Sequence, residues 1–183
     1  MHDNQFCQNG SYDGYNSLLL PMLRKEFRQT REEVTGGNKV KALSGYAEWF
    51  WLMAKGWKDV ENRNWSLYRY IKPSELPSRI YLHASKTPAS EDELNFIDTI
   101  LLQDNVDKLT EFHQVDWAKY RGAIIGETTI IGQCQAGEFA WGEKVSPWFF
   151  GQYGFWVKSG ILYPNPIPYR GQLGFFDVKL LEN

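Results

Sequence analysis

The segment Gly56-Trp57-Lys58-Asp59-Val60-Glu61-Asn62-Arg63-Asn64-Trp65 brings together lysine, acid, arginine and tryptophan directly after an apolar, helix-like run. Side chains alternate between the two faces of a strand. A strand here would therefore project Glu61, Arg63 and Trp65 from one face, with Lys58 at the start of the strand. The charged trio, Lys58, Glu61 and Arg63, lies beside an indole and suits a pocket for a small, polar, planar ligand such as a nucleobase.

Sequence patterns on both sides of this segment predict the elements that surround it. Residues 40–43 are a short strand candidate, and residues 46–55 are predicted to form a buried helix that ends at Gly56. Residues 79–85 alternate apolar and polar side chains, which predicts a strand. The capping box Ser90-Glu91-Asp92-Glu93 begins a second helix, because its serine and second glutamate can bond each other's backbone N–H groups.

The C-terminal half of the chain is predicted to be mostly β-structure. Residues 123–131 are apolar on both faces, as in a central barrel strand. Two further strands are predicted at residues 153–157 and 174–180, with the proline-rich segment 163–168 between them, whereas residues 104–120 are predicted to be loop with at most a short helix. Together these elements predict an α+β fold, a mixed β-barrel with flanking helices.

Residues 1–38 are predicted to be an N-terminal extension of the domain at residues 39–183. The first part of this extension is polar and rich in Asn, Gln, Gly and Tyr, which is typical of a flexible lead. Leu19, Leu23 and Phe27 then fall near helical spacing, which predicts an amphipathic helix that packs on the main domain.

Composition limits both the class of protein and the kind of partner. The chain has 183 residues, of which 43% are hydrophobic and 16% aromatic, as expected for one globular domain. Its formal net charge of -2 and its pI of about 5.9 argue against a surface that coats nucleic-acid phosphates. They leave room for a local basic patch.

Cysteine, histidine and hydropathy patterns argue against several other classes. The two cysteines, Cys7 and Cys134, lie far apart, and none of the three histidines has a paired spacing, so we expect no disulfide, metal or cofactor. We find no signal-peptide pattern and no apolar run of membrane length. We therefore expect a cytoplasmic protein with no membrane partner.

Four separated pieces of the chain resemble the ASCH domain, a branch of the PUA-like superfamily. The family's Gly-x-Lys-x-x-Glu-x-Arg pattern is present as Gly56, Lys58, Glu61 and Arg63, within the first piece, KALSGYAEWFWLMAKGWKDVENRNW. The other pieces are IYLHASK, GAIIGETTI, and SPWFFGQYGFWV leading to PIPYRGQLGFFDV. In order and spacing, the four pieces cover about residues 39–180.

This resemblance implies a PUA-like β-barrel with flanking helices and a cleft above the barrel. In the family, the cleft is thought to hold RNA, a nucleotide or a modified base. Some relatives are amidohydrolases that act on acetylated cytidine, and some are reported to cut RNA. In the amidohydrolase branch a threonine nucleophile lies three residues after the lysine, whereas this chain has Glu61 there. A carboxylate does not directly replace a hydroxyl nucleophile.

The charged trio supplies the first candidate site residues. Lys58 and Arg63 suit a phosphate or a base oxygen, and Glu61 can accept a hydrogen bond from a base amino group. The alternative is a structural ion pair in which Glu61 ties Arg63 to the barrel rim. If the protein is a hydrolase, Lys58 and Glu61 are the candidate catalytic residues for proton transfer.

His83, Ser85 and Lys86 form the second candidate group. His83 and Ser85 would share a strand face and are therefore either a nucleophile with its base or a polar rim of the cleft. Lys86 can add a phosphate contact. Glu127, an acid in an apolar strand, is either an acid–base group of raised pKa, a salt-bridge partner of a cation in the trio, or a solvent-facing side chain.

Aromatic residues supply the third group, because aromatic faces stack on bases. We expect one or two of three side chains to face a ligand: Trp65, Trp148 and Tyr153. Their aromatic neighbours are expected to be mostly buried: Phe149, Phe150 and Trp156.

The favoured function is an ASCH-domain module that binds RNA, or the plain or modified base of a nucleotide or nucleoside, with single-stranded DNA as a further partner class. The alternative is a hydrolase, either an amidohydrolase of modified nucleosides or a ribonuclease. A third hypothesis is a protein-interaction domain that uses the N-terminal helix. The sequence leaves the oligomeric state open.

Overall fold

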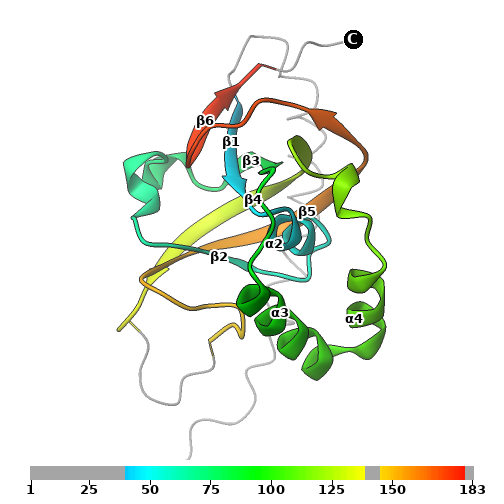
Figure 1. Cartoon of the computed structure of the whole chain (residues 1–183). Coiled ribbons are helices and arrows are strands. Elements are labelled where there is room, and N and C mark those ends of the chain that lie inside the picture. Colours follow the sequence, from blue (N-terminus) through cyan, green and yellow to red (C-terminus); the bar gives the residue numbers. More distant parts are fainter. Residues whose placement is uncertain (1–39, 139–144, 180–183) are drawn as a thin grey trace, which may run out of the picture. The chain divides into compact units, whose positions relative to one another are not determined.

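The computed structural model describes residues 40–138 and 145–179, which form a curved sheet with helices (Figure 1). The predicted extension at residues 1–38 lies outside the described residues. The strands are β1 Val40–Gly45, β2 Val60–Arg63, β3 Ser78–Ala84, β4 Ala123–Gln135, β5 Tyr153–Pro168 and β6 Phe175–Val178. The α-helices are α2 Ala47–Ala54, α3 Glu91–Asp104 and α4 Val106–His113. Short 3₁₀ helices span Leu67–Arg69, Pro73–Glu75 and Trp117–Lys119.

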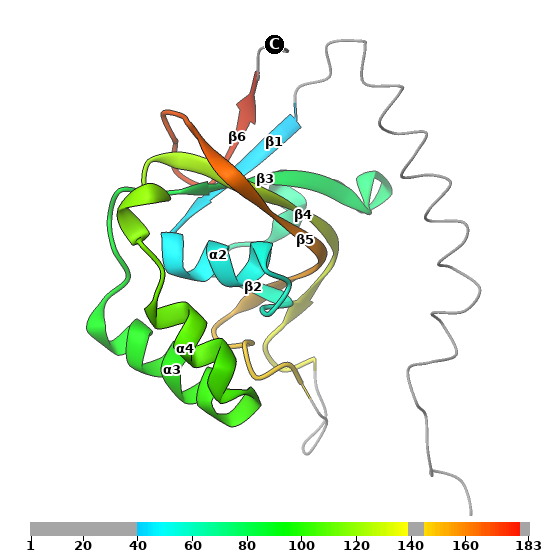
Figure 2. The ribbon, with the colours of Figure 1, turned by 90° about the vertical axis from the view of Figure 1, so that its right-hand side faces the viewer.

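The described strands form one sheet in the order β2-β5-β4-β3-β1-β6. β1 and β3 are parallel, and all other neighbours are antiparallel. The predicted α+β class with a mixed sheet is therefore confirmed. The sheet curls around α2 (Figure 2), but its edge strands β2 and β6 are not paired with each other within the described residues. The predicted closure into a barrel is not seen there.

Helix α2 fills the hollow of the curled sheet and forms the centre of the core. All of its residues are buried, and all but Glu48 are apolar, which is the pattern of a helix covered on every side. Its side chains pack against those of β3, β4 and β5, while α3 and α4 add Ile97 and Phe112 to the same core. Figure 2 shows α2 between the sheet and the α3–α4 pair.

Strand β5 continues through the proline-rich segment that was expected to separate two strands. The ladder between β4 and β5 shifts register in this segment, because Ile124 pairs with Ile167 whereas Gly126 pairs with Leu162. Pro164 and Pro166 therefore lie in an irregular stretch of β5, where the N–H group that proline lacks is not needed for a regular ladder. On the other edge, β2 pairs with β5 only as far as Trp156, so no described strand pairs with the proline-rich segment there.

Helix α4 forms where the sequence pattern predicts mainly loop. Asn105 begins it, because its Oδ1 accepts a hydrogen bond of 2.7 Å from the backbone N of Asp107. Phe112 then anchors the helix in the core. The segment is polar because α4 buries only a narrow apolar stripe that includes Phe112. Its polar composition therefore wrongly indicated a loop.

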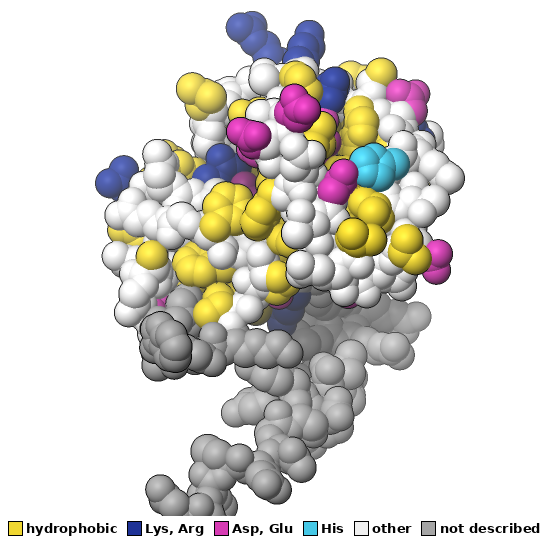
Figure 3. All heavy atoms as spheres, turned by 60° about the horizontal axis from the view of Figure 1, so that its bottom comes forward, with side chains coloured by type: hydrophobic (Ala, Val, Ile, Leu, Met, Phe, Trp, Pro, Cys, Tyr) yellow, Lys and Arg dark blue, Asp and Glu magenta, His cyan; other side chains and the backbone are white. Residues whose placement is uncertain are grey.

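The face formed by α3 and α4 carries several exposed apolar side chains. Phe96, Leu102 and Val106 are all exposed on these helices. Figure 3, seen from this side, shows hydrophobic side chains spread over the face and Lys and Arg mostly toward its edge. No helix in residues 40–138 and 145–179 is long and apolar enough to cross a membrane.

The close approach of β5 to the end of α2 gives a test of the fold. A Cβ atom at Gly160 would collide with the carbonyl oxygen of Met53, which is backbone and cannot rotate away. We expect Gly160→Ala to lower the free energy of unfolding by about 1–3 kcal/mol. Urea denaturation measures this change.

Gly132→Ala is the matched control for this substitution. Gly132 also lies in the sheet, on β4, and an added Cβ atom there would meet nothing within 4 Å. We expect it to leave the free energy of unfolding nearly unchanged. Equal effects of the two substitutions would contradict the proposed packing of α2 against β5.

Candidate functional site

The end of α2 and the strand β2 together position the charged trio. Gly56, which has a φ of 71°, ends the helix, and the backbone N–H groups of Trp57 and Lys58 both bond back to Leu52 O at 2.9 and 3.2 Å. This turn places Lys58 beneath α2. Glu61 and Arg63 then project from the same face of β2, as the strand period predicts.

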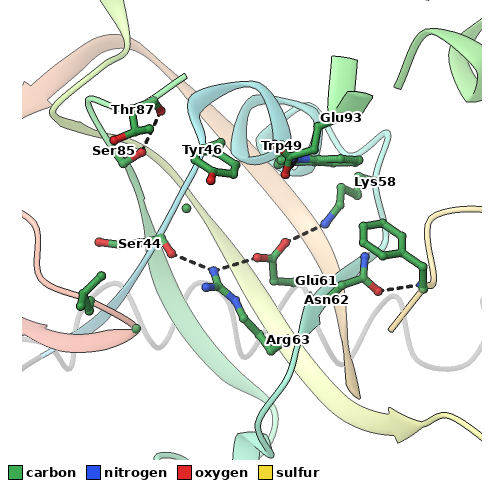
Figure 4. A pocket seen from close by; sticks show the side chains of 14 residues that line it. Ser44, Tyr46, Trp49, Lys58, Glu61, Asn62, Arg63, Ser85, Thr87 and Glu93 are labelled. Atoms are coloured by element: carbon green, nitrogen blue, oxygen red, sulfur yellow. Dashed lines mark hydrogen bonds and ion pairs between the residues drawn. The ribbon is translucent and has the colours of Figure 1, made fainter. Parts of the chain in front are cut away.

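The trio is joined by short ion pairs on both sides of Glu61 (Figure 4). Lys58 Nζ donates to Glu61 Oε2 at 2.7 Å and to Val60 O at 2.5 Å. Arg63 Nη2 lies 2.8 Å from Glu61 Oε1 and donates to Ser44 O at 2.7 Å. The structural ion pair and the ligand-facing cluster were alternatives in the sequence, but the same three side chains form the pair and line a cavity.

Arg63 bridges a gap in the sheet. β1 and β2 are separated by three strands in the sheet order, yet the curl brings them opposite each other. The bond from Arg63 to Ser44 O joins them through a side chain where no strand pairing exists among the described residues. The cavity lies at this gap, because its lining includes Ser44 and Gly45 from β1 and Asn62 from β2.

Burial shifts the titration of Lys58 and Glu61. Lys58 is 2% and Glu61 7% exposed. Burial lowers the pKa of the Lys58 ammonium, and the attraction of Glu61 offsets this only in part. Burial alone would raise the pKa of Glu61, but the charges and hydrogen bonds of Lys58 and Arg63 outweigh it and hold that pKa below its ordinary value. Glu61 is therefore an ionised acceptor at neutral pH.

The cavity has a volume of about 460 Å³ and three kinds of wall. The trio forms a charged wall with Asn62. Aromatic side chains form a second wall: Trp49 and Phe150. Hydroxyl groups form a third: Tyr46, Ser85 and Thr87. The remaining lining residues are Ser44, Gly45, Glu93, Leu173 and Gly174.

Trp49 is the aromatic residue most firmly fixed in this lining. The Lys58 ammonium lies 5.4 Å from the centre of its ring, and its Nε1 donates to Glu93 Oε1 at 3.4 Å. Its ring also contacts Phe150, with the ring centres 6.0 Å apart. Trp49 was not a predicted site residue, because the sequence presents it only as one of many apolar positions in a helix.

Trp148 was expected to face a ligand and Phe150 to be buried, but the structure shows the reverse. Trp148 is 4% exposed and donates from Nε1 to Trp57 O at 2.9 Å, whereas Phe150 is 45% exposed and lines the cavity. Asn62 is the physical reason. Its amide donates to Trp148 O at 2.8 Å and accepts from Phe150 N at 2.9 Å, which fixes the loop with Trp148 turned inward.

Trp65 and Tyr153, the other two expected stacking residues, do not line the cavity. Trp65 packs against Phe155 and lies under the Arg63 guanidinium, 5.7 Å from its ring centre. Trp65 therefore contacts the Arg63 guanidinium but does not itself face the cavity. Tyr153 is half-buried and is the strand partner of Arg63 on β5.

His83 pairs with Ser44 and not with Ser85, the serine of the nucleophile-and-base alternative. Its Nδ1 lies 3.0 Å from Ser44 Oγ, because the parallel register places the two residues opposite each other. Its Nε2 lies 3.0 Å from Tyr169 O, a carbonyl that can only accept, so the neutral ring accepts from the Ser44 hydroxyl. Burial lowers the pKa of His83. This histidine is a satisfied structural group, and it does not line the cavity.

Of the two residues Ser85 and Lys86, only Ser85 lines the cavity. Ser85 lines the cavity and donates from its hydroxyl to Thr87 O at 3.0 Å. Lys86 is exposed and contributes nothing to the lining. The predicted phosphate contact from Lys86 therefore has no support from its position.

Glu127 also lies away from the cavity. Its Oε2 accepts hydrogen bonds from Arg79 and from the Tyr163 hydroxyl, the latter at 2.6 Å. Of the alternatives that the sequence left open for Glu127, a salt bridge does form, but its partner is Arg79 on the adjacent strand and not a cation of the trio. Burial and the bond to Glu127 raise the pKa of the Tyr163 hydroxyl.

Comparison with known proteins identifies no family: no protein-family model matches the chain, and no curated protein matches it. The resemblance to ASCH domains stays a prediction. In residues 40–138 and 145–179, no group of three or more His, Cys, Asp and Glu side chains is arranged to hold a metal ion.

The shared carboxylate of Glu61 predicts a pH-dependent loss of stability. Glu61→Gln leaves two cations without their common anion, so we expect it to lower the free energy of unfolding by about 3–5 kcal/mol at neutral pH. The folded-state pKa of Glu61 lies below its ordinary value of 4.5. The stabilisation is therefore complete above about pH 4.5 and is lost as pH falls through the folded-state pKa.

Urea denaturation of wild type and Glu61→Gln across this pH range measures the effect. The difference between them should be constant near neutral pH and should shrink on acidification. Glu111→Gln is a control, because Glu111 forms a more exposed pair with Lys55. A difference between wild type and Glu61→Gln that grew on acidification would contradict the ion-pair geometry.

Proposed function

We propose that the cavity binds a nucleobase, plain or modified, carried by RNA or by a free nucleotide or nucleoside. One observation carries this proposal: a buried, ionised carboxylate, Glu61, lies between Lys58 and Arg63 in the wall of a cavity. The cavity volume of about 460 Å³ falls in the range usual for small-molecule sites, about 300–1,000 Å³.

The hydrogen-bonding capacity of the trio suits the polar edge of a base. Each oxygen of Glu61 receives one hydrogen bond and keeps room for another, so the carboxylate can accept from a base amino or ring N–H group. Arg63 Nε is buried and has no partner among the described residues. A buried donor without a partner is unfavourable by about 1–3 kcal/mol, and a base oxygen or ring nitrogen would relieve this only after a shift of the Arg63 side chain that exposes Nε.

The aromatic wall supplies the faces that a planar ligand needs. Trp49 is buried at one side of the cavity, and Phe150 is half-exposed beside it. An exposed phenylalanine held in place by Asn62 is a ready stacking surface. Stacking on aromatic side chains contributes roughly 1–3 kcal/mol per base.

We propose further that the domain is an ASCH domain and that its curled sheet corresponds to the barrel of PUA-like proteins. The four segments of resemblance support this, because they include β1, α2 and β2, then β3, β4, and β5 with β6. Of these elements, β1, α2 and β2 contribute residues to the lining of the cavity. The charged wall of the cavity is formed by the charged residues of the Gly-x-Lys-x-x-Glu-x-Arg pattern: Lys58, Glu61 and Arg63.

Phe150→Ala tests the base-binding proposal. The substitution removes a stacking face from a half-exposed position, so it should weaken binding about tenfold or more without unfolding the protein. Titration calorimetry with nucleosides, nucleoside monophosphates and short single-stranded RNA measures the affinity.

Tyr68→Ala is the control, because Tyr68 is 44% exposed, as Phe150 is 45% exposed, and lies outside the cavity. Arg63→Glu should abolish binding, since it places a second carboxylate against Glu61. Unchanged affinity in the Phe150 and Arg63 variants, or no binding of any of these compounds, would overturn the proposal.

The second candidate function is hydrolysis of a modified nucleoside or of RNA. The lowered pKa of Lys58 favours it, because a buried amine of lowered pKa beside a carboxylate is suited to proton transfer. In amidohydrolysis, the neutral amine form of Lys58, which its lowered pKa makes more accessible, would accept a proton from the attacking water and pass it to the departing base amine. The water oxygen would end on the released acid.

Mass spectrometry of acylated and alkylated cytidines and adenosines, and of RNA, incubated with the protein tests this alternative. Under it, wild type should release the free nucleoside or cut RNA, and Lys58→Met should reduce turnover by at least about a hundredfold. Lys55→Met is the control, because Lys55 binds Glu111 outside the cavity. Lack of turnover by wild type, or full turnover by Lys58→Met, would refute the hydrolase alternative.

A further inference from the structure

The cavity has a wall of hydroxyl groups that the base-binding proposal does not use. Tyr46, Ser85 and Thr87 all line it. Figure 4 shows these three on one side of the cavity and the charged trio on the other. Tyr46 precedes α2, whereas Ser85 and Thr87 lie on the loop after β3, so the fold brings them together from two segments.

Two of these hydroxyls are free within the described residues. No hydrogen bond from the Tyr46 or Thr87 hydroxyl occurs there, and the Ser85 hydroxyl donates to Thr87 O while keeping its acceptor capacity. In Figure 4 the Tyr46 oxygen points into the space above Glu61 and Arg63. The wall therefore offers both donors and acceptors to a ligand.

The loop that carries Ser85 and Thr87 is held at both ends. Ser85 N donates to Gly45 O at 2.8 Å, which continues the pairing of β1 and β3. At the other end, Ala89 N donates to Glu48 Oε2 at 3.3 Å, and Glu48 is a buried residue of α2. The hydroxyls are thus positioned before any ligand arrives, which reduces the entropy lost on binding.

The chemistry of this wall suits a neutral, hydroxyl-rich group better than a phosphate. The lining cations among the described residues are Lys58 and Arg63, and both are paired with Glu61 on the other wall. Lys86 is next to Ser85 in sequence but does not line the cavity. A wall of hydroxyl groups with no unpaired cation beside it is complementary to a ligand that itself carries hydroxyl groups. Each hydroxyl of such a ligand can both donate and accept a hydrogen bond.

We propose that Tyr46, Ser85 and Thr87 form a sugar subsite that binds the ribose hydroxyls of the ligand whose base lies against Glu61 and Arg63. This inference rests on the proposed base-binding function and deepens it, because it assigns the sugar and selects ribose over 2′-deoxyribose. The 2′-hydroxyl is the group by which a protein distinguishes the two sugars.

Matched ribose and deoxyribose compounds test the subsite by titration calorimetry. The probes are cytidine with 2′-deoxycytidine, adenosine with 2′-deoxyadenosine, and a short single-stranded RNA with the DNA of the same sequence. We expect the ribose form to bind about tenfold more tightly in each arm that binds, as the loss of one well-placed hydrogen bond predicts. The nucleoside and oligonucleotide arms distinguish a free ligand from an RNA chain.

Tyr46→Phe and Thr87→Val remove one hydroxyl each and keep the shape of the side chain. Each should reduce the ribose preference to below about threefold while leaving the affinity for the deoxyribose form nearly unchanged. Tyr68→Phe is the control, because it removes a tyrosine hydroxyl outside the cavity.

The outcomes separate the subsite from the site it rests on. Equal affinity of wild type for ribose and deoxyribose forms, or an unaltered preference in both variants, overturns the sugar subsite and leaves base binding in place. If wild type binds none of the probes, the base-binding proposal falls and the subsite falls with it.

Discussion

The carboxylate of Glu61, shared between Lys58 and Arg63, is the interaction on which the rest of the structure depends. A buried carboxylate is tolerated only when paired, and a buried ammonium likewise. Each partner of Glu61 therefore fixes a different element. Lys58 holds β2 beneath the end of α2, and Arg63 carries the connection across to Ser44 on β1. One anion thereby links the helix, the edge strand and the far side of the sheet.

This arrangement also explains why the curled sheet can remain open where a barrel was expected. β1 and β2 face each other across the hollow of the curled sheet, and the Arg63 guanidinium joins them through a side chain, since β1 already pairs with β3 and β6. A side-chain bridge leaves room for the cavity beside it, so the opening in the sheet and the candidate site have the same origin.

Local patterns in the sequence predicted the elements, whereas contacts between distant segments decided the site. The alternation around Glu61 and Arg63 and the capping box at Ser90 depend on neighbours along the chain, and both are confirmed. The burial of Trp148 depends on Asn62, which lies 86 residues away. The pairing of His83 with Ser44 depends on a parallel register that no local pattern reports. Tyr46, Trp49 and Thr87 were missed for the same reason.

The position of Glu61 bears on the choice between binding and hydrolysis. In the amidohydrolase branch of ASCH domains, the family that we propose for this domain, a hydroxyl nucleophile lies three residues after the lysine, whereas this chain has the carboxylate of Glu61 there. That carboxylate is engaged on both oxygens by cations, which lowers its basicity and favours a fixed acceptor over a group that gains and loses protons. The hydroxyls of the cavity lie on the opposite wall, away from Lys58 (Figure 4). Recognition of a base can use Glu61 as an acceptor where it lies, whereas hydrolysis would need water to act in place of the threonine nucleophile of the amidohydrolase branch.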